Sequence, residues 1–167
     1  REVGALAAAA RHGARVLELW DEVPDAEDVA DMDRVQVMMD LAADSMLAGK
    51  TAAQTWAERA LELVDPTSEP ARYADIAARL AQYQLLAGQP EVALRTIGVA
   101  GDLIEPQPVS SEKARVAVQH AQILMNCDLL PTCRERALTA RGLAAQTGDR
   151  GVEVQARGIY GLALCTL

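Results

Sequence analysis

Few stretches of this 167-residue sequence have the residue types and spacing that chemistry requires. The tripeptide Gly49-Lys50-Thr51 has the form of the end of a phosphate-binding loop, whose backbone N–H groups surround phosphate oxygens between a strand and a helix. That loop needs a glycine five residues before Gly49, where this chain has Asp44, and both flanking patterns are helical. We therefore interpret the tripeptide as a turn between two helices, with Thr51 as the cap of the second.

Histidine and cysteine do not form a recognisable ligand or nucleophile set. Cys127 and Cys133 are separated by five residues, and neither His12 nor His120 completes a metal-binding spacing with them. With Cys165 the cysteines number three, which does not indicate a disulfide framework; we interpret them as small buried side chains in a reducing cytoplasm. We expect His120 to pack on a helix face without a catalytic partner, and we predict no enzyme activity, cofactor or metal.

Acidic side chains dominate the charge of the chain. There are 24 Asp and Glu residues against 16 Lys and Arg, and the formal net charge is −8. Ten of the acids lie between Glu18 and Asp44, where Arg34 is the single basic residue. This balance argues against binding to nucleic acid or to an anionic membrane surface. We expect this stretch to be a solvated surface; a docking patch for a basic partner is the alternative.

The elements that position these residues are predicted to be helices. The sequence has 32 alanines and 20 leucines, no phenylalanine, and none of the Val- and Ile-rich runs that are typical of strands. Glycine, proline and aspartate divide it into helical stretches with short connections, an all-α layout. We expect Asp31 to cap the second helix. The eight expected helices cover residues 6–20, 31–48, 51–64, 68–87, 90–104, 110–127, 131–148 and 149–167.

The expected helices repeat in pairs, with a period of about 40 residues. The turns at Gly49, Gly88 and Asp128 are 39 and 40 residues apart. A period of this size predicts a solenoid of antiparallel helical hairpins, in which small side chains let paired helices approach closely. The pattern resembles a tetratricopeptide repeat with longer loops; a plain helical bundle is the alternative. The recurring small residues are Ala42, Ala81, Ala121 and Gly161.

Both ends of the sequence match the interior of a repeat. Residues 16–19 (VLEL) align with residues 60–63 (ALEL) of a second helix, whereas Gly161 lies at the small position of a first helix. The leucines at 162, 164 and 167 do not resemble the polar cap of a free solenoid. We therefore expect residues 1–167 to be one repeat domain, either a fragment of a longer array or an array completed by a partner copy.

Five phrases carry a family resemblance: residues 17–26 (LELWDEVPDA), 59–66 (RALELVDP), 69–72 (EPAR), 83–88 (YQLLAG) and 146–150 (QTGDR). In this order they resemble the tetratricopeptide-like region of large actinobacterial LuxR-type transcriptional regulators of the maltose-regulator-like subgroup. Those regulators place a signal-transduction ATPase before the repeats and a helix-turn-helix DNA-binding domain after them. The motifs of neither domain occur in this sequence. The resemblance implies inducer sensing or self-association that gates the ATPase.

Hairpin solenoids bind partners in a groove that the first helix of each pair lines. Polar side chains there would suit an extended peptide or an oligosaccharide, and a merely solvated groove is the alternative. We therefore expect a cytoplasmic protein-interaction and signal-sensing module, with a protein, a peptide or a small-molecule inducer as partner. The alternative is a structural adaptor that self-associates through its open ends. Counting from the turns, the candidate groove residues are Gln36, Met39, Asp75, Gln82, Arg115, Gln119, Gln122 and Asn126.

Overall fold

The computed structural model describes residues 2–47 and 52–165, and within them all side chains except those of residues 2–4, 6 and 7. Over these residues the chain has helices and no strand, which confirms the expected all-α fold. None of the described helices has the length and apolarity that a membrane span requires. The tripeptide Gly49-Lys50-Thr51 lies outside the described residues. The helices are α1 (Glu2–Leu19), the 3-10 helix η1 (Trp20–Glu22), α2 (Ala26–Ala30), α3 (Arg34–Leu47), α4 (Ala52–Glu62), α5 (Pro70–Leu86), α6 (Pro90–Ile104), α7 (Ser111–Asn126), α8 (Leu130–Thr147) and α9 (Arg150–Cys165).

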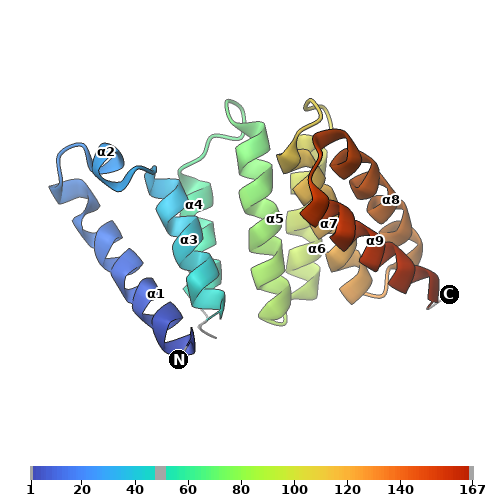
Figure 1. The fold of residues 1–167 in the computed structure, drawn as a ribbon, viewed down its shortest axis with the longest axis horizontal. Helices are drawn as coiled ribbons and strands as arrows, with labels where there is room; N and C mark the ends of the chain where they lie inside the picture. Colours follow the sequence, from blue (N-terminus) through green and yellow to red (C-terminus); the bar gives the residue numbers. More distant parts are fainter. Residues whose placement is uncertain (1, 48–51, 166–167) are drawn as a thin grey trace. The chain divides into compact units, whose positions relative to one another are not determined.

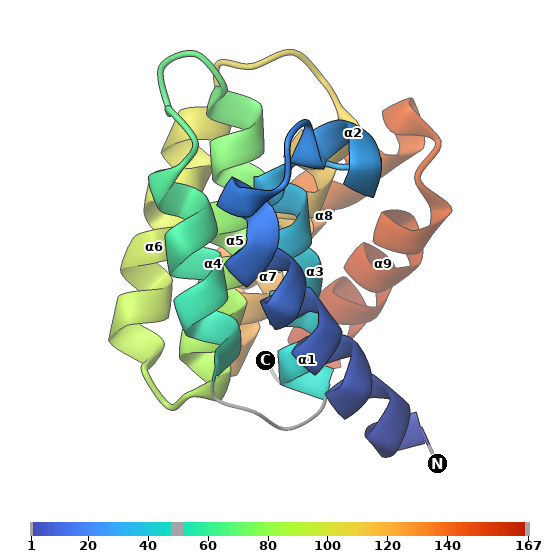
Figure 2. The same ribbon diagram turned by 90° about the vertical axis from the view of Figure 1, so that its left-hand side faces the viewer.

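The contacts divide the chain into two compact units, residues 1–64 and 65–167. In the first unit, α3 packs against both α1 and its hairpin partner α4. A β-carbon at Gly13 of α1 would lie 3.4 Å from Cδ1 of Leu41, an ordinary van der Waals distance, so α1 and α3 pack directly on each other at this glycine. Figure 2 shows α2 beyond the C-terminal end of α1, connected to it through η1.

The second unit stacks helical hairpins on one another. Helices α5 and α6 form one hairpin, α7 and α8 form the next, and α9 packs against α7 and α8 (Figure 1). Helix α7 also contacts α5 and α6, so the first helices of successive hairpins are neighbours. This is the arrangement of a helical-hairpin solenoid, as the 40-residue period predicts.

Alanine fills the tightest helix contacts. Ala81 and Ala121, the predicted small positions of α5 and α7, have no exposed surface, and neither has Ala42 of α3. Gly161, the corresponding residue of α9, is exposed. Cys133 follows Ala93 by 40 residues and is equally buried, so it replaces an alanine as a small apolar side chain.

The turn after the first helix of each hairpin has the same backbone conformation in both repeats of the second unit. Gly88 after α5 has a φ of 77°, and Asp128 after α7 has a φ of 57°. A left-handed residue at this position closes the helix, and glycine adopts it without a steric penalty. Asp128 therefore keeps the turn of the repeat with a less suitable residue.

The region between α1 and α3 differs from the expectation. The sequence predicts one long connection followed by a helix that Asp31 caps. Instead, Asp31 ends the short helix α2 with a φ of 52°, and Asp25 precedes α2 with a φ of 56°. Helix α3 begins at Arg34, and its cap is Asp33, whose Oδ1 accepts a hydrogen bond from the backbone N–H of Gln36 at 2.8 Å. The assignment of the cap to Asp31 is therefore wrong, because this residue serves α2.

Candidate interaction surfaces

An ion pair joins the first helices of the two hairpins in the second unit. Nε of Arg115 on α7 donates to Oδ1 of Asp75 on α5 at 2.9 Å, and Nη2 of Arg115 donates to Oε1 of Glu112 at 3.2 Å. Burial opposes the charge of Arg115, but the hydrogen bond and charge of Asp75 outweigh it, so the pKa of Arg115 is raised. Asp75 and Arg115 are 40 residues apart, so they occupy the same position of neighbouring repeats.

Four other expected groove residues lie on the same two helices. Gln82 of α5 and Gln122 of α7 are half-buried and again 40 residues apart. Asn126 is exposed, and its Nδ2 donates to the backbone oxygen of Gln122 at 2.9 Å. Gln119 is half-buried, and its buried Nε2 has no hydrogen-bond partner. We call the surface formed by Asp75, Gln82, Arg115 and Gln122 the α5–α7 face.

The two remaining candidates belong to the first unit. Gln36 is exposed on α3, and its Nε2 donates to Oδ1 of Asp40 at 2.8 Å. Met39 is only 2% exposed and lies among the buried residues of α3. Its assignment to an open groove is therefore wrong: α3 packs against both α1 and α4, which leaves this position inside the core.

A surface that the sequence analysis missed lies where α1 leads into α2. It is an open hollow of about 290 Å³ whose lining residues are all Val, Leu, Trp or Ala. The end of α1, η1 and the residue after it contribute one part of the lining, and α2 contributes the other. The sequence does contain a signal for this surface. Apolar residues follow Val16 at spacings of three, four and seven residues, a helical pattern that continues into the acidic stretch. The lining residues are Val16, Leu19, Trp20, Val23, Ala26, Val29 and Ala30; we call them the α1–α2 hollow.

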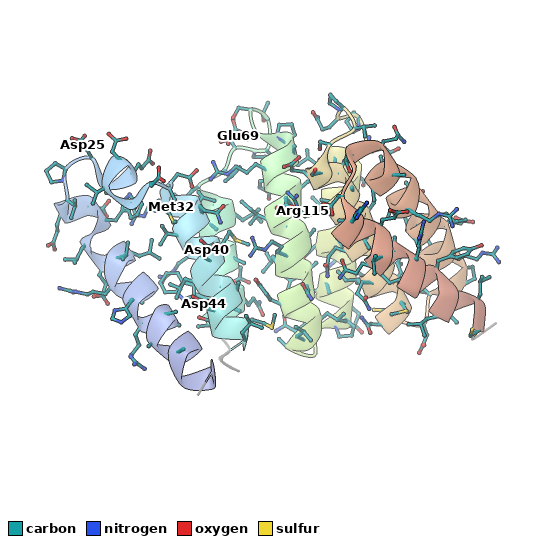
Figure 3. The ribbon with its side chains drawn as sticks, in the orientation of Figure 1. Asp25, Met32, Asp40, Asp44, Glu69 and Arg115 are labelled. Carbon is teal, nitrogen blue, oxygen red and sulfur yellow. The ribbon has the colours of Figure 1, made fainter. Side chains whose placement is uncertain are left out.

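A second, acidic hollow adjoins the first. It has a volume of about 330 Å³ and is lined by Asp25, Glu27 and Asp28 together with Trp20, Val23 and Ala26 of the α1–α2 hollow. Figure 3 shows Asp25 where the chain enters α2, whereas Asp40 and Asp44 lie on α3. Arg34 does not neutralise these acids, because its guanidinium binds both carboxylate oxygens of Asp21, at 3.0 and 3.3 Å.

His120 is packed, as expected, and lies against α6. A β-carbon at Gly101 would come within 3.2 Å of its Nδ1, so this glycine makes room for the imidazole. Burial lowers the pKa of His120 to about 4; the positive charge of Arg136 adds to this effect and the negative charge of Asp102 opposes it.

The cysteines are free thiols with different surroundings. Cys133 is buried as expected, and Cys127 is half-buried. Burial raises the pKa of both thiols, which makes them less reactive. Cys165 is exposed, contrary to the expectation. Within the described ranges, no three His, Cys, Asp or Glu side chains cluster as metal ligands.

The chain matches no protein-family model, no curated protein and no solved structure.

Proposed function

We propose that this chain is a protein-interaction and signal-sensing repeat module that binds an extended peptide on the α5–α7 face. The observation that carries the proposal is the repetition of polar side chains in register. Asp75 and Arg115 pair at one repeat position, and Gln82 and Gln122 occupy another. Amide side chains offer a donor and an acceptor each, so they match the N–H and C=O groups of an extended backbone.

The family resemblance supports a cytoplasmic context for this module. In a LuxR-type transcriptional regulator, a repeat region lies between an ATPase and a DNA-binding domain. Binding of a protein, a peptide or a small-molecule inducer to the repeats would then control the neighbouring ATPase. This segment itself would contribute recognition and no catalysis or DNA contact.

The α5–α7 face is tested with an array of extended synthetic peptides. We expect the wild-type chain to bind a subset of them, and we expect Gln82→Ala with Gln122→Ala to weaken that binding without changing the melting temperature. Gln146→Ala is the matched control, because Gln146 is an exposed amide on α8 whose Nε2 donates to the Gly142 oxygen of its own helix. Unaltered binding by the double variant, or no binding by the wild type, would refute the proposal.

A second candidate function is a structural adaptor that self-associates through α9. Val154, Leu162 and Leu164 are exposed on this helix, by 69%, 57% and 47%. Sedimentation equilibrium over a range of concentrations would then show association that Leu164→Glu abolishes. Val99→Glu, at an exposed valine of α6, is the control that should leave association unchanged. A chain that stays monomeric at all concentrations excludes this candidate.

A further inference from the structure

The α1–α2 hollow exposes apolar side chains that a folded protein usually covers. Val29 of α2 is 75% exposed, and Val16 and Val23 are 42% and 39% exposed. These residues do not stand alone, since all three line the same hollow together with Trp20. This grouping distinguishes them from the singly scattered apolar side chains of an ordinary protein surface.

The lining of the hollow favours a macromolecular partner over a small molecule. Pockets for small ligands measure roughly 300–1,000 Å³ and place a few polar groups among the apolar ones. The α1–α2 hollow has about 290 Å³ and no polar residue in its lining. It therefore suits the apolar side chains of a protein segment, which bring their own backbone and do not need to be oriented by polar groups.

Charge identifies the chemistry of that segment. Asp25, Glu27 and Asp28 line the adjoining acidic hollow, which shares Trp20 and Val23 with the apolar one. A partner that fills the first hollow with apolar side chains therefore places its neighbouring side chains beside three carboxylates. Lysine and arginine are the side chains that complement them, and the same carboxylates would repel an anionic membrane or an acidic peptide.

We propose that the α1–α2 hollow is the docking site for a basic amphipathic helix of another protein. A helix presents apolar residues along one side and, three or four residues away, cationic residues along the next. Its apolar side chains enter the hollow between the end of α1 and α2, and its lysines or arginines contact Asp25, Glu27 and Asp28. This site is separate from the α5–α7 face and does not depend on it.

The probe is a synthetic amphipathic helix with leucines on one side and lysines on the other. Its companion peptide has alanine in place of each leucine and the same charge. The chain contains two tryptophans, so Trp56→Phe leaves Trp20, in the lining of the hollow, as the single tryptophan, which is excited selectively over the three tyrosines. We expect the leucine peptide to change the Trp20 emission and to bind roughly tenfold or more tightly than the alanine peptide, because it buries apolar area.

Two kinds of variant locate the contact. Ala26→Phe fills the hollow and Val29→Ser removes an exposed apolar contact; we expect each to weaken binding of the leucine peptide by roughly tenfold. Val29 is mostly exposed, so Val29→Ser should leave the fold intact. It therefore tests the contact even where Ala26→Phe disturbs the fold. Asp25→Asn with Asp28→Asn should weaken binding at low salt and reduce its salt dependence. Asp40→Asn with Asp44→Asn removes the same charge away from α2 and should have little effect.

Three results would overturn the proposal. In the first, the alanine peptide binds as tightly as the leucine peptide, which means that charge alone is recognised. In the second, Val29→Ser and the Asp25/Asp28 variant both bind the leucine peptide like the wild type. In the third, the chain without peptide self-associates in sedimentation and Val29→Ser abolishes this, which makes a second copy the occupant.

Discussion

The buried imidazole of His120 should make the stability of the second unit depend on pH. The pKa of His120 falls from 6.5 to about 4 because burial disfavours the charged form, with Arg136 acting in the same direction. The folded chain therefore keeps this histidine neutral, whereas the unfolded chain takes up a proton below about pH 6.5. The contribution of this histidine to the free energy of unfolding is therefore fully present above that pH. It is lost progressively as the pH falls toward 4.

The size of this loss follows from the two pKa values. A shift from 6.5 to about 4 corresponds to about 3 kcal/mol when the transition is complete. Between about pH 7.5 and about pH 5.5 the same shift lowers the free energy of unfolding by ~1.3 kcal/mol. The side chain is only half-buried, so solvent screening reduces the expected loss to ~1 kcal/mol. This range stays above the isoelectric point near 4.7 and above the ordinary pKa values of carboxylates.

The assay is urea unfolding followed by circular dichroism at the two pH values. The wild type should lose ~1 kcal/mol of unfolding free energy at the lower pH, and His120→Gln should lose much less because it removes the titrating group. His12→Gln is the control, since His12 is exposed on α1 and should leave the wild-type loss unchanged. If His120→Gln loses as much stability as the wild type, the pH dependence has another origin and the reasoning is refuted.

Three further predictions concern the turns, a buried amide and an ion pair of the second unit. Gly88 and Asp128 both have a positive φ, which glycine adopts without strain and other residues do not. Gly88→Ala should therefore lower the free energy of unfolding by ~1 kcal/mol and Asp128→Gly should raise it by ~0.5 kcal/mol. Opposite changes in melting temperature would contradict this. Gln84→Met should raise the unfolding free energy by ~1 kcal/mol, because Oε1 of Gln84 is buried without a partner; a loss in urea unfolding would show that it has one. A double-mutant cycle with Asp75→Ala and Arg115→Ala should give a coupling of ~0.5 kcal/mol for this partly exposed pair, and zero coupling would show that it does not stabilise the fold.

Most of the helices could be predicted because their boundaries depend on local chemistry. Helix α6 begins at Pro90 and ends at Ile104, as expected, since proline is favoured in a first turn. Ser110 caps α7 with its Oγ, which accepts from the backbone N–H of Lys113 at 3.2 Å. These signals need only a few neighbouring residues, so the sequence is enough to read them.

Helix α2 could not be predicted, because its local sequence signals are those of a loop. It has five residues and lies between two aspartates in the left-handed conformation, Asp25 and Asp31. Few non-glycine residues adopt that conformation, and Pro24 with its acidic neighbours is more typical of a loop. The α1–α2 hollow depends on where this helix lies, so it could be found only in the three-dimensional structure.

The candidate residues of the α5–α7 face were predictable because they depend on the repeat. An offset of 40 residues gives Asp75 and Arg115 the same position in neighbouring hairpins, and the structure pairs them. The same counting failed for Met39. Its exposure depends on which helices pack on α3, and the repeat does not specify that α1 and α4 both do.

The alanine-filled helix contacts have a thermodynamic consequence. A methyl group loses no rotamer entropy when it is buried, and it hides much less apolar surface than a leucine or phenylalanine. The heat-capacity change of unfolding grows with the apolar surface that becomes exposed, and usually amounts to about 12–15 cal/mol/K per residue. A core in which positions such as Ala81, Ala121 and Ala140 have no exposed surface should therefore unfold with a smaller change per residue. The free energy of unfolding would then vary gently with temperature, giving this chain a broad and shallow stability curve.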